Sequence, residues 1–156
     1  MEFKIEIDAP KEKVWNVLWG EKTYPMWTAA FGEGSRVETD WKKGSKALFL
    51  GAENSGMVSR IVENIPYDYM SIEHLGMVMN GIEDLESEEV KRWAGAKENY
   101  TLKDVDAKTE LHVFMEMDDT EDNKAMIEMF AEMWPKALAN VKSLAEQDEI
   151  IPPVVV

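Results

Sequence analysis

The segment from residue 126 to residue 146, MIEMFAEMWPKALANVKSLAE, constrains the fold more than any other part of the chain. At about 100° per residue, its methionine, aromatic and aliphatic side chains fill one arc of roughly half the helix circumference. Its lysines and glutamates fill the other arc. The pattern predicts a long amphipathic helix, and the apolar face of such a helix has to be covered by another layer of secondary structure.

Pro135 interrupts this segment, and a proline inside a helix removes one backbone hydrogen bond and bends the helix. On the helical wheel it falls in the middle of the charged arc, so the carbonyl of Ala131, which loses its partner, can bond water. The bend is expected to place the convex side of the helix toward solvent. The apolar face would then curve over the layer beneath it.

The layer beneath is predicted to be an antiparallel sheet. Residues 2–7, EFKIEI, alternate strictly between apolar and charged side chains, as in a half-buried strand. The segment DAPKEKVWNVLW predicts a helix capped by Asp8, and TYPMW at 23–27 predicts a short second helix or turn. Further strands, separated by turn sequences, are expected at 35–39, 45–51, 56–65, 69–79, 98–105 and 109–117.

These elements predict an α+β fold in which the strands pack against the long helix. The acidic segment at 80–98 interrupts the meander and is expected to be a solvated loop, with a short helix at 84–94 as the alternative. At 156 residues the chain is expected to form a single domain, over residues 1–147. Residues 148–156 form a tail with an apolar end, either disordered or packed on a neighbouring molecule.

Charge argues against several classes of partner. Lys and Arg number 17 against 31 Asp and Glu, and this net charge of −14 repels nucleic acid and anionic lipid headgroups. No segment approaches the ~18 apolar residues of a membrane-spanning helix, and the start MEFKIEID has no apolar signal region. We therefore expect a soluble cytoplasmic protein that binds no nucleic acid and does not insert into a membrane.

No catalytic or cofactor-binding motif is recognisable. The absence of cysteine excludes thiolate catalysis and iron–sulfur clusters, and the two histidines lack the spacing of a metal site. A nucleophile elbow, a phosphate loop and a dinucleotide fingerprint are also missing. We expect no metal and no cofactor, and the balance is against an enzyme. Acid–base catalysis from a cavity stays open, with Glu73, His74 and Tyr100 as candidates.

The two histidines are predicted to lie on opposite faces of the sheet. His112 is out of phase with the apolar residues of TELHVFMEM and is expected to face outward beside carboxylates. His74 is in phase with Ile72 and Val78, which places it on the inner face. A buried histidine needs a hydrogen-bond partner, and Tyr100, a backbone carbonyl or a polar group of a ligand are the candidates.

The order of strand, two helices, six strands and long helix resembles the SRPBCC (START-related, helix-grip) superfamily, and within it the bacterial homologues of the activator of heat-shock-protein-90 ATPase. The segments that carry the resemblance are DAPKEKVWNVLW with YPMW after it, GMVSRIVENIPYDYMSIEHLG, GIEDLESEEVKRWAGAKENYTL leading to TELHVFMEM, and MWPKALANVKSLAE. It implies a helix-grip fold, in which a curved seven-stranded antiparallel sheet wraps around the C-terminal helix and two short helices follow strand one. A cavity for a hydrophobic molecule would lie between sheet and helix. No single activity is implied, because the superfamily includes lipid carriers, hormone receptors, cyclases and co-chaperones.

By facing and by this resemblance, the cavity wall is predicted to consist of large apolar side chains with a few polar ones. For each apolar residue taken singly, filling the core is the favoured interpretation, but as a set they favour a cavity, because three methionines on one helical face suit varied apolar guests. The last four residues of the predicted set would form the lid. The set is Trp15, Trp27, Met57, Met70, Ile72, His74, Tyr100, Met126, Phe130, Met133 and Trp134.

The expected function is binding of a hydrophobic or aromatic small molecule, without catalysis. A stress-related, co-chaperone-like interaction module is the first alternative, with a chaperone as partner. A cyclase or aromatase using acids and bases of the cavity is the second. The apolar tail and an exposed sheet edge also make a homodimer a reasonable expectation.

Overall fold

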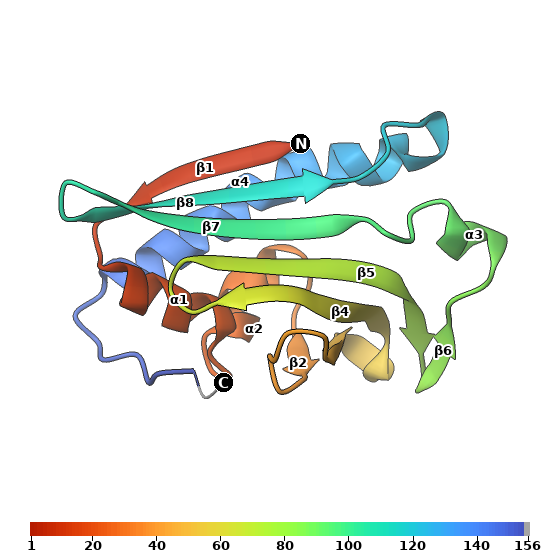
Figure 1. Ribbon diagram of the computed structural model, residues 1–156, viewed down its shortest axis with the longest axis horizontal. Helices are drawn as coiled ribbons and strands as arrows, with labels where there is room; N and C mark the ends of the chain where they lie inside the picture. Colours follow the sequence, from red (N-terminus) through yellow and green to blue (C-terminus); the bar gives the residue numbers. More distant parts are fainter. Residues whose placement is uncertain (155–156) are drawn as a thin grey trace.

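The computed structural model describes residues 1–154, in which helices back one antiparallel sheet (Figure 1). All the predicted strands and the long helix are present, which confirms the α+β fold. In chain order the elements are β1 (Glu2–Ile7), α1 (Lys11–Trp19), α2 (Tyr24–Trp27), η1 (Thr28–Ala30), β2 (Arg36–Glu38), β3 (Lys46–Leu50), η2 (Ala52–Asn54), β4 (Gly56–Ile65), β5 (Tyr69–Met79), β6 (Ile82–Asp84), α3 (Glu88–Lys91), β7 (Lys97–Val105), β8 (Lys108–Glu116), η3 (Glu121–Asn123) and α4 (Lys124–Glu146).

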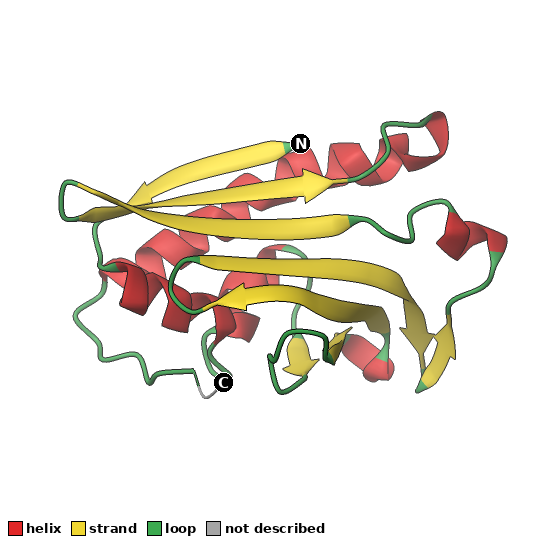
Figure 2. Cartoon of the chain, in the orientation of Figure 1, coloured by secondary structure: helices red, strands yellow, loops and turns green. Residues whose placement is uncertain are grey.

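The sheet runs in the order β1-β8-β7-β5-β4-β3-β2, and β6 pairs with the end of β5 as an eighth strand. Strands β1 and β2 are therefore its edges. In Figure 2 the strands form one layer and α4 runs behind it. This arrangement leaves one face of the sheet for the helices and exposes the other.

The segment 80–98 is more ordered than the solvated loop that its charge pattern favours. It contains β6 and, as in the alternative prediction, a short helix, α3. Ser87 caps α3 by accepting the Val90 N–H at 3.3 Å. Val90 and Trp93 are buried and anchor the segment, because two apolar side chains hold an otherwise charged stretch against the protein.

A β-bulge in β5 changes which of its residues face the helices. His74 pairs with Ser59 of β4, and the next pair along the ladder skips Leu75. Beyond the bulge, Met77 lies on the same side as His74. Val78 packs instead in a separate apolar cluster with residues of β3 and β4. The predicted shared face of His74 and Val78 is therefore wrong, since the inserted residue breaks the period of two.

Helix α4 has two halves of different burial. In its C-terminal half Ala137, Leu138 and Val141 are buried against the core that includes α1, β1 and β8. In its N-terminal half the methionines are only partly buried or exposed. Pro135 is exposed, which confirms its predicted place on the solvent side of the helix.

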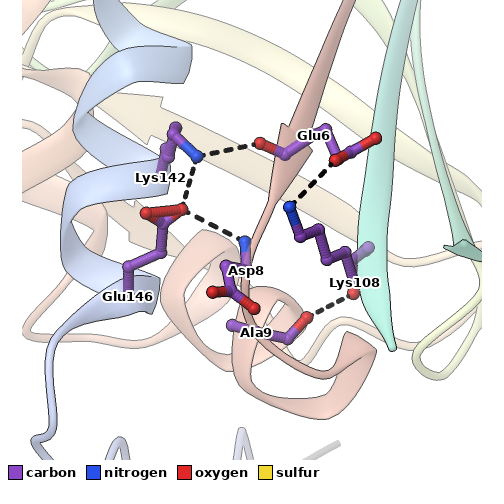
Figure 3. Close-up of polar contacts among 7 residues, drawn as sticks. Glu6, Asp8, Ala9, Lys108, Lys142 and Glu146 are labelled. Atoms are coloured by element: carbon purple, nitrogen blue, oxygen red, sulfur yellow. Dashed lines mark hydrogen bonds and ion pairs between the residues drawn. The ribbon is translucent and has the colours of Figure 1, made fainter. Parts of the chain in front are cut away.

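A polar cluster fixes the C-terminal end of α4 against the connection from β1 to α1 (Figure 3). Lys142 Nζ donates to the Glu6 carbonyl at 3.1 Å and pairs with Glu146 on its own helix. Glu146 Oε2 accepts the backbone N–H of Asp8 at 3.1 Å. Asp8 is therefore tied to α4 and does not cap α1, whose N-cap position is Pro10.

After α4 the chain returns to α1. Ile151 and Val154 pack against the core, and the Val154 N–H donates to Asn16 Oδ1 at 3.3 Å. Ile150 is 94% exposed. Residues 155 and 156 of the predicted tail lie outside the described residues. Within residues 1–154, no helix combines the length and the apolar character needed to cross a bilayer.

Candidate ligand cavity

A cavity of about 490 Å³ lies between the sheet and the N-terminal half of α4. Strands β3, β4, β5, β7 and β8 contribute to its floor, and the methionine-rich part of α4 forms its lid. Residues of α2 and η1 close one side, and Trp93 follows α3 on another. Glu89 and Met129 also line it and are exposed, which marks an open end. The volume lies within the roughly 300–1,000 Å³ typical of small-molecule pockets.

Most of the predicted wall residues lie around this cavity, and their contact with a ligand stays a prediction. Two do not reach it. Trp15 and Met70 are each 1% exposed and belong to the core. Both were predicted from the face on which they lie, but the face does not determine the depth of a side chain. Each has a neighbour that does reach the cavity: Trp19 contacts Trp15, and Tyr100 is the ladder partner of Met70. Those that line it are Trp27, Met57, Ile72, His74, Tyr100, Met126, Phe130, Met133 and Trp134.

Some of the wall residues missing from the prediction come from helix ends, loops or the strand beyond the bulge, where no periodic signal is present. Others lie within regular elements: Met115 and Met129 are on predicted apolar faces, and Glu98 precedes Tyr100 by two residues on one strand, where side chains two apart share a face. That spacing predicts a carboxylate on the inner face. The larger additional side chains include Trp19, Tyr24, Phe31, Phe49, Met77, Trp93, Glu98, Met115, Met117 and Met129.

Four side chains form a hydrogen-bonded chain: His74, Glu98 and Tyr100 lie on the floor of the cavity, and Ser59 is fully buried. Ser59 Oγ lies 2.7 Å from His74 Nδ1, and His74 Nε2 lies 2.7 Å from Glu98 Oε1. The Tyr100 hydroxyl donates to Glu98 Oε2 at 2.7 Å. An ionised carboxylate only accepts hydrogen bonds, so His74 carries a proton on Nε2. The partners that buried His74 requires are therefore Ser59 and Glu98.

Glu98 places an ionised carboxylate on the floor of the cavity. Burial raises the pKa of its carboxyl, but the charge and hydrogen bond of His74 and the hydrogen bond of Tyr100 outweigh burial and hold that pKa below its ordinary value. Burial, followed by the charge of Glu98, raises the pKa of the Tyr100 hydroxyl well above its usual range. The same two causes raise the pKa of Tyr24. At neutral pH both hydroxyls are protonated and Glu98 is ionised.

The order Ser59, His74, Glu98 has the residue types of a hydrolase triad but not its accessibility. Ser59 is fully buried and is not part of the cavity wall. Its Oγ therefore cannot reach the carbonyl of a bound molecule, as a nucleophile must. The bond from Ser59 orients the His74 ring instead.

The third acid–base candidate, Glu73, and the other histidine, His112, lie on the outer face of the sheet. His112 Nε2 lies 2.8 Å from Glu2 Oε2, so this histidine faces outward beside a carboxylate as predicted. Glu73 pairs with Arg60 at 2.6 Å. In the part of the chain that the structure describes, no three His, Asp or Glu side chains gather as metal ligands.

Solved structures of low sequence identity share this fold. Protein MLL2253 from Mesorhizobium loti is 12% identical, with a TM-score of 0.72 over 96% of this chain and 100% of that one. The Aha1 dimer from Colwellia psychrerythraea is 16% identical, with a TM-score of 0.66 over 96% and 98% of the two chains. CalU16 from Micromonospora echinospora is 15% identical, with a TM-score of 0.64 over 98% and 68%.

No curated protein matches the chain in sequence. The family described as Activator of Hsp90 ATPase homolog 1-like protein matches residues 8–146. This range runs from the residue after β1 to the end of α4 and includes every element that lines the cavity. The chain therefore belongs to the family of Activator of Hsp90 ATPase homolog 1-like proteins, which confirms the resemblance seen in its sequence.

Proposed function

We propose that this protein binds a hydrophobic or aromatic small molecule between its sheet and α4, and holds it without chemical conversion. The observation that carries the proposal is the cavity of about 490 Å³, with its apolar wall and a few polar groups on its floor. Small-molecule sites have this composition. The cytoplasm is part of the proposal, because a chain without cysteine needs no oxidising compartment.

The wall combines stiff and adaptable parts. Phe31 makes edge-to-face contacts with Trp134, at a ring-centroid distance of 5.1 Å, and with Phe130, at 6.4 Å. Packed aromatic rings of this kind keep their positions. The methionines of the lid are unbranched and repack easily around guests of different shape. A flat or bulky apolar molecule fits such a site better than a small polar one.

Two alternatives from the sequence stay predictions. One is a protein-interaction module, with a chaperone or a second copy of the chain as partner. The other is a cyclase or aromatase. The groups of the cavity that could transfer a proton are hydrogen-bonded to one another. For this reason we favour binding without catalysis.

The neutral fluorescent probe N-phenyl-1-naphthylamine tests the proposal. Met57 and Met77 are cross-strand partners on the wall, so Met57→Trp/Met77→Trp should fill part of the cavity. We expect the wild type to bind the probe and the double variant to bind it at least about tenfold more weakly. The matched control is Met79→Trp, on the same strand but 58% exposed and outside the cavity.

Thermal unfolding would first establish that each variant is folded. A wild type that does not bind the probe would overturn the proposal. So would a folded double variant that binds the probe as tightly as the wild type does.

A further inference from the structure

The charge on the cavity wall has one sign. Among the wall residues that the structure describes there is no lysine or arginine, and the carboxylates are Glu89 at the open end and Glu98 on the floor. Only His74 can offset Glu98, and both of its ring nitrogens are engaged, with Ser59 and with Glu98. The wall therefore offers no free cationic group to an incoming anion.

Two neutral donors on the wall are also closed to a ligand. The indole N–H groups of Trp19 and Trp134 have no hydrogen-bond partner among residues 1–154, but surrounding atoms cover both nitrogens. A molecule in the cavity cannot reach them without a rearrangement of these buried rings. They therefore do not supply an anion site.

Glu98, in contrast, has unused capacity to accept hydrogen bonds. An ionised carboxylate has about four lone-pair sites, and the protein uses one on each oxygen, for His74 and for Tyr100. The side chain is 20% exposed and lies on the wall. A donor on a bound molecule can therefore reach an acceptor that is already ionised.

Tyr24 adds a neutral hydroxyl to the same wall. Burial and the charge of Glu98 raise its pKa, so its hydroxyl is protonated. Among residues 1–154 this hydroxyl has no hydrogen-bond partner, and it can donate or accept. A ligand hydroxyl could donate to Glu98 and accept from Tyr24, whereas a carboxylate could use only Tyr24.

We infer that the cavity takes a neutral or cationic apolar molecule whose polar end is a hydroxyl or an amine donating to Glu98, and that it rejects carboxylates, sulfonates and phosphates on the same skeleton. The inference rests on the proposed function. Charge interactions strengthen away from water. An anion beside Glu98 is therefore repelled, and a donor forms a charge-assisted hydrogen bond.

Competition against bound N-phenyl-1-naphthylamine tests the ligand class. The competitors share one ring system and differ in their polar end: 2-naphthalenemethanol, 2-naphthalenemethylamine as the cation, and 2-naphthoate. For the wild type we expect the alcohol and the amine to displace the probe at concentrations at least about tenfold lower than 2-naphthoate. Comparing the two charged competitors separates charge sign from hydrophobicity.

Glu98→Gln keeps the size of the side chain and removes its charge, so it should bring the amine and 2-naphthoate to within about threefold of each other. Glu73→Gln is the matched control, because it removes one charge from the outer face of the sheet. It should leave the wild-type ranking intact.

The outcomes distinguish a failure of the proposed function from a failure of the inferred ligand class. A wild type that does not bind the probe removes the proposed function, and the inference with it. Probe binding with 2-naphthoate competing as well as the amine and the alcohol overturns the ligand class and leaves the proposed function standing. An unchanged ranking in folded Glu98→Gln also overturns it. If that variant does not fold, the wild-type ranking decides.

Discussion

Tyr100 joins the polar and apolar parts of the cavity. Its ring lies with centroid distances of 4.8 Å from Trp19 and 6.0 Å from Trp134. Its hydroxyl donates to the Glu98 carboxylate at 2.7 Å. This residue therefore packs the wall and, after the larger contribution of His74, adds a hydrogen bond that lowers the pKa of Glu98.

Removing that hydroxyl should have a measurable cost. Tyr100→Phe keeps the ring, and we expect it to lower the free energy of unfolding by about 1.5–3 kcal/mol. It should also raise the pKa of Glu98, which loses a donor. Urea denaturation would measure the first effect.

The control is Tyr69→Phe, whose hydroxyl donates to the uncharged Asn99 Oδ1 at 3.1 Å. A loss of about 0.5–1.5 kcal/mol is expected there. Equal losses in the two variants would contradict the role assigned to the charge of Glu98.

Among the elements, α4 is divided near Pro135 into a half that lines the cavity and a half that belongs to the core. The polar cluster of Lys142 and Glu146 holds the core half against β1. The lid half therefore extends from a fixed base. The exposed position of Pro135 is confirmed, and the bend toward the sheet stays a prediction.

Pro135→Ala tests whether the bend shapes the lid. It restores a backbone donor for the Ala131 carbonyl, so we expect the free energy of unfolding to rise by about 1–3 kcal/mol. The affinity for N-phenyl-1-naphthylamine should fall, because a straight helix no longer curves over the cavity. Lys136→Ala is the control, an exposed neighbour whose pair with Glu132 contributes only about 0.2–0.5 kcal/mol. Unchanged probe binding in Pro135→Ala would show that the lid does not need the bend.

The periodicity of the sequence predicted the helices and strands well, but it did not reveal two features of the sheet, the bulge at Leu75 and strand β6. The bulge at Leu75 is an extra residue in a hydrogen-bond ladder, and Leu75 is itself apolar, so hydropathy does not reveal it. Met77 was missed and Val78 misplaced for this reason. Strand β6 is too short to show a period: it forms a hairpin with the end of β5, and its backbone and Leu85 lie so close to Gly76 of β5 that no Cβ would fit there.

For the whole molecule, sequence could predict which residues face inward but not how deep they lie. Depth depends on which neighbours cover a side chain, and those neighbours come from other elements. Trp15 and Met70 lie behind the wall for this reason, and Glu98 meets His74 only because β5 and β7 are adjacent. The loop and helix-end residues of the wall could not be predicted for the same reason, because neighbours from other elements decide which of them reach the cavity.

The shifted pKa values of the folded chain predict a range of pH over which the free energy of unfolding stays constant. Carboxyls such as Glu63, which accepts a hydrogen bond from Lys43, and Glu98 have lowered pKa values. The stability that they contribute is present above the ordinary value of 4.5 and is lost as pH falls further. Tyr24 and Tyr100 have raised pKa values, so their contribution is present below the ordinary value of 10.0 and is lost as pH rises above it.

Urea midpoints across the pH range would check this shape. We expect a plateau with a decline on each side, a shallower acid limb in Glu98→Gln and a shallower alkaline limb in Tyr100→Phe. Stability that increased on acidification below pH 4 would contradict the assigned directions.

The tryptophans of the cavity have a practical consequence. Four of the six in the chain, Trp19, Trp27, Trp93 and Trp134, lie on its wall. An aromatic guest that absorbs in the near ultraviolet would accept excitation energy from these rings at contact range. Quenching of the intrinsic tryptophan emission would therefore report an occupied cavity without a label or a substitution.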